Sequence, residues 1–111
     1  MAWRIRDRDT FERLRRTGRR SRRGPVTVTF CTDRDEGAPR VAYAVGRRVG
    51  GAVERNRLRR RLRAVVDQLD GTLAPGAYLV SAGRDALGLP FEDLKADVTA
   101  AMTSASVERR P

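Results

Sequence analysis

The chain has 111 residues, a length that suits one domain over residues 1–111 with a core of its own. It contains no histidine and one cysteine, Cys31, so an internal disulfide and the usual zinc sites are excluded. We see no apolar run long enough to span a membrane and no apolar leader, so we expect a cytoplasmic protein without a membrane partner. The formal net charge is +10, with net +13 on residues 1–66 and −3 on residues 67–111. This asymmetry predicts a basic face suited to nucleic acid.

The first predicted element is a short helix. The run from Asp9 to Glu12 resembles a capping box, with an Asx residue at the helix start and a glutamate three residues later. A helix is therefore expected over residues 10–17, with Gly18 as the C′ glycine that ends it. The arginine-rich run 19–23 that follows is interpreted as a basic connector.

Two strands are predicted next. Residues 26–30 alternate strictly, which is typical of a half-buried strand with its valines and phenylalanine facing inward. Residues 41–45 form the second apolar strand. The segment 33–39 between them is polar and contains Gly and Pro, so it favours a hairpin.

The remaining elements are a helix, a strand and a helix. They are expected over residues 52–69, 77–81 and 91–107, which gives the order α-β-β-α-β-α. A strand, a helix and a strand in succession suggest a βαβ crossover, so we expect an α+β sandwich with a mixed or split sheet covered by helices. Residues 46–51 fit equally a flexible turn and an anion-binding nest before the basic helix.

The arginine-rich run 55–63 is the most informative feature of the chain. Apolar residues recur through it at helical spacing, at Leu58, Leu62, Val65, Val66 and Leu69. At about 100° per residue, the outer face of this helix carries Asn56, Arg60 and Arg63, flanked by Arg57 and Arg59. A docked helix with guanidinium groups on its outer face suits phosphate, because each guanidinium can engage two oxygens.

The sequence offers no constellation of catalytic residues. A hydrolytic enzyme needs a base, a nucleophile or a metal cage, whereas the acidic residues here fit turn chemistry and helix starts. Cys31 is interpreted as a small, half-buried strand residue. We therefore expect a binding protein with no catalytic and no metal-ligating residues, whose partner supplies any catalysis.

Residues 45–63 resemble the signature of the protein subunit of bacterial ribonuclease P. That signature is a glycine-rich basic loop that leads into Arg-Asn-Arg and then into alternating basic and aliphatic residues. Weaker likenesses, at residues 9–11, 16–20, 75–78 and 91–94, extend the resemblance over about residues 9–105.

The resemblance implies a fold and a function. The fold is an α-β sandwich whose βαβ crossover has the uncommon left hand. The function is to bind a large catalytic RNA and the 5′ leader of precursor tRNA, so that the RNA, with Mg²⁺, releases the mature 5′ end. The implied enzyme is the ribonuclease P endoribonuclease, with its catalytic groups and most Mg²⁺ ligands in the RNA and no obligate protein partner.

The resemblance also implies two sets of site residues. Contacts with the catalytic RNA, or the organisation of metal near it, are implied for Arg55, Asn56, Arg57, Arg60 and Arg63, and RNA contacts are also implied for Arg48 and Arg59 beside them. A leader-binding cleft is implied at Phe11, Arg15, Thr27 and Thr29. The last three stand where the family often has aromatic or bulky side chains. Because base stacking contributes about 1–3 kcal/mol per base, this cleft is expected to depend more on charge.

Two other functions stay open at this point. One is a structured-RNA binding protein of the ribosomal type with no role in cleavage. The other is a DNA-binding repressor that uses residues 53–69 as a recognition helix. The repressor is disfavoured, because a helix-turn-helix needs a preceding helix and an almost purely arginine face positions a duplex more than it reads base edges.

Overall fold

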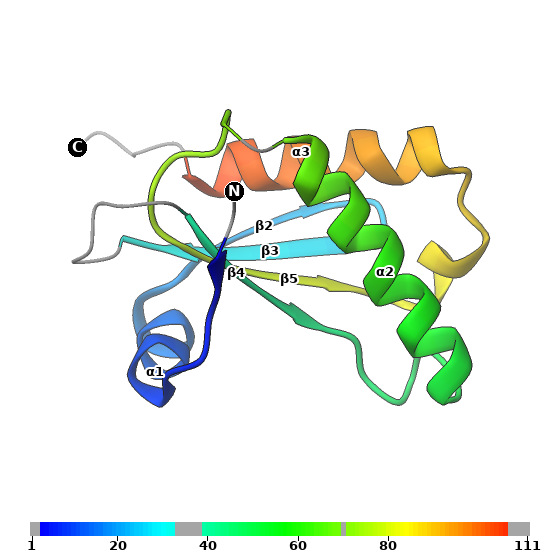
Figure 1. Cartoon of the computed structure of the whole chain (residues 1–111), viewed down its shortest axis with the longest axis horizontal. Helices are drawn as coiled ribbons and strands as arrows, with labels where there is room; N and C mark the ends of the chain where they lie inside the picture. The colour runs from blue at the N-terminus through cyan, green and yellow to red at the C-terminus, as the bar shows by residue number, and fades with distance from the viewer. Residues whose placement is uncertain (1–2, 33–38, 70, 107–111) are drawn as a thin grey trace.

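The computed structural model, shown in Figure 1, describes residues 3–32, 39–69 and 71–106. Within these ranges a mixed five-stranded sheet carries helices on both faces. The elements in chain order are β1 (Trp3–Arg4), α1 (Arg8–Thr17), β2 (Arg19–Arg23), β3 (Val26–Cys31), β4 (Arg40–Ala44), α2 (Ala52–Gln68), β5 (Ala77–Ala82), the 3₁₀ helix η1 (Arg84–Gly88) and α3 (Phe91–Ser106). The predicted α+β sandwich is confirmed, with β1 and β2 as additional strands.

The strand order is β1-β4-β5-β3-β2. Strands β1, β4 and β5 run parallel, whereas β3 is antiparallel to both β5 and β2. The predicted hairpin between β3 and β4 is wrong, because β5 lies between them and pairs with both. Its predicted turn at 33–39 lies mostly outside the described residues. In Figure 1, α2 crosses in front of the sheet as the chain passes from β4 to β5, which gives the expected left-handed crossover.

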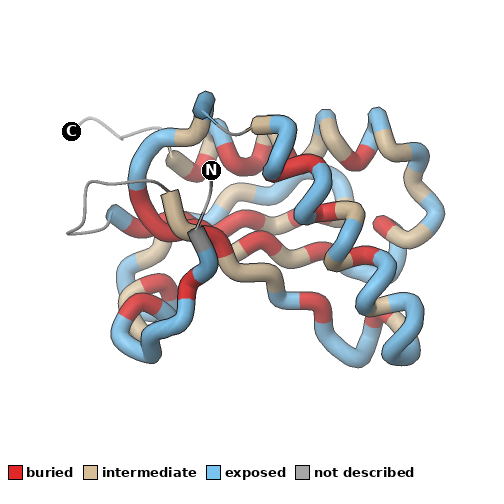
Figure 2. The backbone as a smooth tube through the Cα atoms, viewed as in Figure 1, coloured by how far each residue is buried: buried red, intermediate tan, exposed pale blue. Residues whose placement is uncertain are grey.

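The sheet separates a large core from a small one. Helices α2 and α3 cover one face, where the inward residues of β3, Val26, Val28 and Phe30, are buried as predicted. Helix α1 covers part of the other face, where Leu14 packs with Ile5, Cys31 and Ala77. Figure 2 shows the buried positions concentrated along the central strands. Because α2 and α3 both lie on the first face, the part of the second face that α1 does not cover is not covered by them either.

Helix α1 begins and ends differently from its prediction. Asp7, not Asp9, caps it, and its carboxylate accepts the Thr10 N–H at 3.0 Å. Gly18 ends the helix with extended, not left-handed, backbone. A glycine suits this position for lack of space, because a Cβ there would lie 2.2 Å from the Leu14 carbonyl oxygen and 2.4 Å from Thr29 Cγ2.

The run 19–23 is a strand and not a connector. Strand β2 pairs with β3 along its whole length, from Arg19 opposite Phe30 to Arg23 opposite Val26. It forms the edge of the sheet, and all five of its side chains are exposed or half-buried. Charged side chains are tolerated at such an edge and discourage pairing with a further strand.

Candidate nucleic-acid interface

Helix α2 presents arginines to solvent because its apolar stripe is docked on the core. Leu58, Leu62, Val65 and Val66 have no exposed surface. The side chains exposed on the other face are Asn56, Arg57, Arg60 and Arg63, and those of Arg55 and Arg59 are half-buried. The predicted rotation of the helix is therefore confirmed.

Two contacts order the basic face of α2. Arg59 Nη1 donates to Asn56 Oδ1 at 2.6 Å. The Arg63 guanidinium carbon lies 5.7 Å from the ring centroid of Tyr43 on β4, a cation–π contact. Side chains that are already ordered lose less conformational entropy when they bind phosphate.

Arg61 differs from the other arginines of the run because it faces the protein. Its guanidinium donates to the carbonyl oxygens of Ala86 and Leu87 at 3.2 and 3.4 Å and to that of Leu89. These bonds satisfy carbonyl groups at the end of η1 and connect it to α2. Arg61 thus supports the fold and lies apart from the predicted RNA-contacting set.

The loop before α2 is an ordered turn. The N–H of Val49 donates to the Gly46 carbonyl at 3.1 Å, and the Val49 side chain is buried. Gly50 has a φ of 155°, and a Cβ there would lie 2.1 Å from a Glu54 carboxylate oxygen. That carboxylate accepts the Gly51 N–H at 2.7 Å. It therefore caps an amide that an anion would otherwise use, which favours the turn over the nest, while Arg48 is exposed in the loop.

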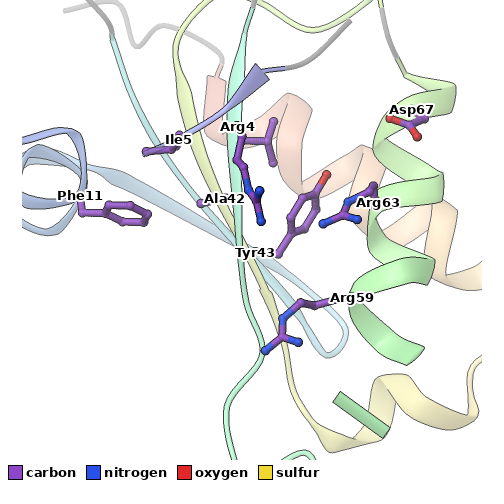
Figure 3. A pocket seen from close by; sticks show the side chains of 9 residues that line it. Arg4, Ile5, Phe11, Ala42, Tyr43, Arg59, Arg63 and Asp67 are labelled. Carbon is purple, nitrogen blue, oxygen red and sulfur yellow. The ribbon is translucent and has the colours of Figure 1, made fainter. Parts of the chain in front are cut away.

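Two hollows of about 430 Å³ each meet at Phe11, whose side chain is 39% exposed. The first lies between α1, β4 and α2 and is drawn in Figure 3. It is lined by Arg4, Ile5, Phe11, Val41, Ala42, Tyr43, Arg59, Arg63 and Asp67. The second lies beside α1 and is lined by Arg8, Phe11, Glu12, Leu14, Arg15, Arg20, Thr29 and Leu79. We call the two hollows together the Phe11 groove.

The structure brings three of the four predicted cleft residues together. Phe11, Arg15 and Thr29 line the second hollow, whereas Thr27 is half-buried further along β3 and outside both. The half-buried strand predicted over residues 26–30 would leave Thr29 on the exposed face, but Thr29 is only 8% exposed. Helix α1 packs over this part of β3, so Thr29 lines the side of the second hollow and does not form an open binding surface.

Several groove residues were missed from the sequence. The strand register places Arg20 of β2 opposite Thr29, which brings its charge to the groove. Tyr43, Arg4 and Asp67 come to the first hollow from three separate elements. The one local signal that could have pointed to Tyr43 as a groove residue is that it is an aromatic side chain in the strand that precedes the basic helix.

Arg40 fixes α1, and hence Phe11, against the sheet. From β4 it donates to Asp7 Oδ1 at 2.9 Å and to the Thr10 hydroxyl at 2.7 Å. The Thr10 hydroxyl in turn donates to the Asp7 carboxylate at 2.6 Å. These bonds hold the pKa of Asp7 well below its usual range. The hydrogen bond from the Thr10 hydroxyl has the largest effect, and the one from Arg40 the next largest. The carboxylate therefore stays ionised at neutral pH.

Two further features bear on the class of site. No helix among the described residues is long and apolar enough to cross a membrane. Across the same part of the chain, no three His, Cys, Asp or Glu side chains gather in a way that could hold a metal ion. The arrangement is a basic helix face beside a groove that combines cations with an exposed aromatic ring.

Comparison with known proteins identifies the family of the chain. The family model described as Ribonuclease P matches residues 1–106. The chain belongs to the bacterial ribonuclease P protein family. It is similar to the ribonuclease P protein component of Chloroflexus aggregans, with 37% identity over 103 residues that cover 91% of this chain and 76% of that protein. It is also similar to the component of Symbiobacterium thermophilum, with 35% identity over 98% of this chain and 96% of that protein.

Solved ribonuclease P proteins share the fold. The Staphylococcus aureus protein superposes with a TM-score of 0.84 at 20% identity, covering 98% of this chain and all of that chain. The Thermotoga maritima protein superposes with a TM-score of 0.82 at 20% identity, covering 96% of this chain and 98% of that chain. The family match and the similar proteins named above make the chain a ribonuclease P protein component, a part of the ribonuclease P ribozyme that processes tRNA, and they imply the ribonuclease P RNA as its partner.

Proposed function

We propose that the protein binds the catalytic RNA through the exposed face of α2 and holds the 5′ leader of precursor tRNA in the Phe11 groove. In this way it promotes removal of the leader to give the mature tRNA 5′ end. The observation that carries the proposal is the docked basic face of α2 beside a groove with both charge and an exposed aromatic ring.

The face of α2 suits a structured RNA. Arg57, Arg60 and Arg63 project from one rigid helix, and the Arg63 guanidinium is already placed by Tyr43. Planar guanidinium groups can contact two phosphate oxygens each. We assign contacts with the catalytic RNA to this face and to the exposed Arg48 in the loop before it.

The Phe11 groove suits a single strand. Single-stranded nucleic acids bind where cations follow the backbone and aromatic rings stack on bases. Here Arg15 and Arg20 stand on one side of Phe11, and Arg59 and Arg63 stand on the other. A strand that crosses Phe11 therefore meets positive charge on both sides, which supports leader binding with a large electrostatic share.

The hydrolytic step belongs to the RNA in this proposal. The family implies Mg²⁺, but the acidic side chains of the described residues do not gather into a set that fits a protein-held ion. We therefore assign the Mg²⁺ ligands to the RNA. The chain's own residues hold the two RNAs together and offset their phosphate repulsion. A cytoplasmic location stays a prediction.

Reconstitution of the holoenzyme distinguishes this function from the alternative, a structured-RNA binding protein with no role in cleavage. The protein is mixed with a bacterial ribonuclease P RNA, and precursor-tRNA cleavage is measured at low Mg²⁺ with and without it. We expect the protein to raise kcat/KM, and to raise it more for a substrate with a leader of full length than for one with a short leader. Tight RNA binding with no effect on cleavage would support the structured-RNA alternative instead.

A further inference from the structure

We propose that the hollow between α1, β4 and α2 is a base-binding subsite, where the Tyr43–Arg63 pair stacks one unpaired leader base and Asp67 accepts a hydrogen bond from its amino group. The inference rests on the proposed function, because it concerns a leader in the same groove. It adds a preference for cytosine, adenine or guanine over uracil at one leader position.

The stacking surface is already assembled. Tyr43 is half-buried on β4, with the Arg63 guanidinium carbon 5.7 Å from its ring centroid. In Figure 3 the Tyr43 ring stands between Arg4 and Arg63, and Phe11 lies on the far side of Arg4. Unpaired RNA bases stack on aromatic rings and on guanidinium planes. The hollow measures about 430 Å³, within the range of sites that enclose small ligands.

Tyr43 provides an aromatic stacking surface in addition to Phe11, and the second hollow has none besides Phe11. The second hollow has Arg15 and Thr29 beside Phe11 and contains no other aromatic ring among its lining residues. Tyr43 is the second aromatic side chain of the Phe11 groove, and it lies in the first hollow. The aromatic contribution that Arg15 and the β3 threonines cannot make is therefore available from β4.

Asp67 gives the subsite its selectivity. It follows Arg63 by four residues on α2, so both side chains leave the same side of the helix, and both line the hollow. Both also act on the Tyr43 hydroxyl: burial raises its pKa to about 12, Arg63 opposes that rise and Asp67 adds to it. The hydroxyl therefore stays protonated beside the two charges.

Carboxylate chemistry decides between the bases. An ionised carboxylate accepts hydrogen bonds and donates none, so it pairs with amino groups such as that of cytosine. Uracil has no amino group, and its single ring N–H lies between two carbonyl oxygens that repel a carboxylate. Asp67 is the one acidic residue that lines this hollow, among Arg4, Arg59 and Arg63. Arg4 and Arg59 remain available to the leader phosphates.

The test measures base preference at each leader position in turn. Holoenzymes are assembled with a bacterial ribonuclease P RNA and the parent protein, Asp67→Asn, Tyr43→Leu, or the matched control Asp93→Asn on α3. Equilibrium binding is compared for precursor tRNAs in which one amino-bearing leader base at a time is replaced by uridine. Melting temperatures of the free proteins establish that each variant is folded.

At one position, uridine is expected to weaken binding about tenfold for the parent and for Asp93→Asn, as for loss of one charge-assisted hydrogen bond. With Asp67→Asn, whose amide both donates and accepts, the difference should fall below about twofold. Tyr43→Leu should weaken binding of every base there by about fivefold or more.

Two results would overturn the subsite: no position at which the parent discriminates against uridine, or full discrimination retained by Asp67→Asn. If leader-dependent binding persists in either case, the proposed function stands without this subsite. If no protein shows leader-dependent binding, the proposed function and the subsite are both wrong.

Discussion

In the proposed function Arg15 binds the leader, so its ion pair with Glu12 would compete with the leader, and removing Glu12 should strengthen leader binding. In the free protein Arg15 Nη2 lies 2.6 Å from Glu12 Oε2, and Glu12 Oε1 lies 3.8 Å from Arg16 Nε. The Arg15 side chain is 75% exposed, and exposed pairs of this kind contribute about 0.2–1 kcal/mol. Glu12→Gln removes the competing partner and a negative charge from the groove. Leader-dependent affinity should therefore rise about twofold to fivefold at low salt.

Salt dependence separates charge from stacking in the same groove. Each phosphate contact to a single strand changes the slope of log affinity against log salt by about 0.7. Arg15→Ala should therefore flatten the slope by about that amount. Phe11→Ala should leave the slope unchanged while it weakens binding, by about 1–3 kcal/mol if one base stacks there.

The assay is holoenzyme affinity for precursor and for mature tRNA over a salt series, because the ratio of the two isolates the leader. Glu92→Gln on α3 is the matched control for loss of one exposed carboxylate. Weaker leader binding by Glu12→Gln would refute the competition. If Arg15→Ala keeps the parent slope and a shorter leader binds equally well, the groove does not hold the leader, although the family assignment is unaffected.

Three further predictions concern the fold and the basic helix. Leu62 is fully buried, so Leu62→Ala should lower the free energy of unfolding by about 2–5 kcal/mol, and a melting temperature equal to the parent's would show that α2 is rotated differently. Arg57→Ala and Arg60→Ala should keep the melting temperature but weaken affinity for the catalytic RNA, which a filter-binding titration checks. The folded pKa of Asp7 is depressed, so the contribution of its ionised carboxylate to the free energy of unfolding is complete above about pH 4 and is lost as the pH falls below that value. Thermal melts should therefore show the parent losing stability more steeply below this pH than Asp7→Asn. Parallel curves for the two proteins would contradict this.

The sequence was most predictive where the signal is local and periodic. The recurrence of Leu58, Leu62 and Val65 placed α2 to within one residue and oriented its arginines. The alternation over residues 26–30 likewise identified the buried side of β3. Both patterns arise because one face of the element is buried, and the resulting periodicity can be read within one short segment of sequence.

The errors arise from contacts between distant segments. Strand β2 has no apolar alternation, and it pairs because β3 offers a free edge. The position of β5 between β3 and β4 leaves no local trace, so the turn-like segment between those strands suggested a hairpin. Thr29 is buried because α1 folds over it, and Tyr43 and Asp67 share a hollow only once β4 and α2 are docked.

Site-specific photo-crosslinking tests the central claim most directly. A thiol-reactive crosslinker is attached to Arg57→Cys on α2 or to Arg15→Cys in the groove, and the holoenzyme is irradiated with precursor tRNA bound. Cys31 is buried, and parent protein treated with the reagent controls for its reaction. We predict that the Arg57→Cys probe labels the catalytic RNA and that the Arg15→Cys probe labels the 5′ leader. Labelling of the catalytic RNA from both positions, with none on the leader, would contradict the division of roles between α2 and the Phe11 groove.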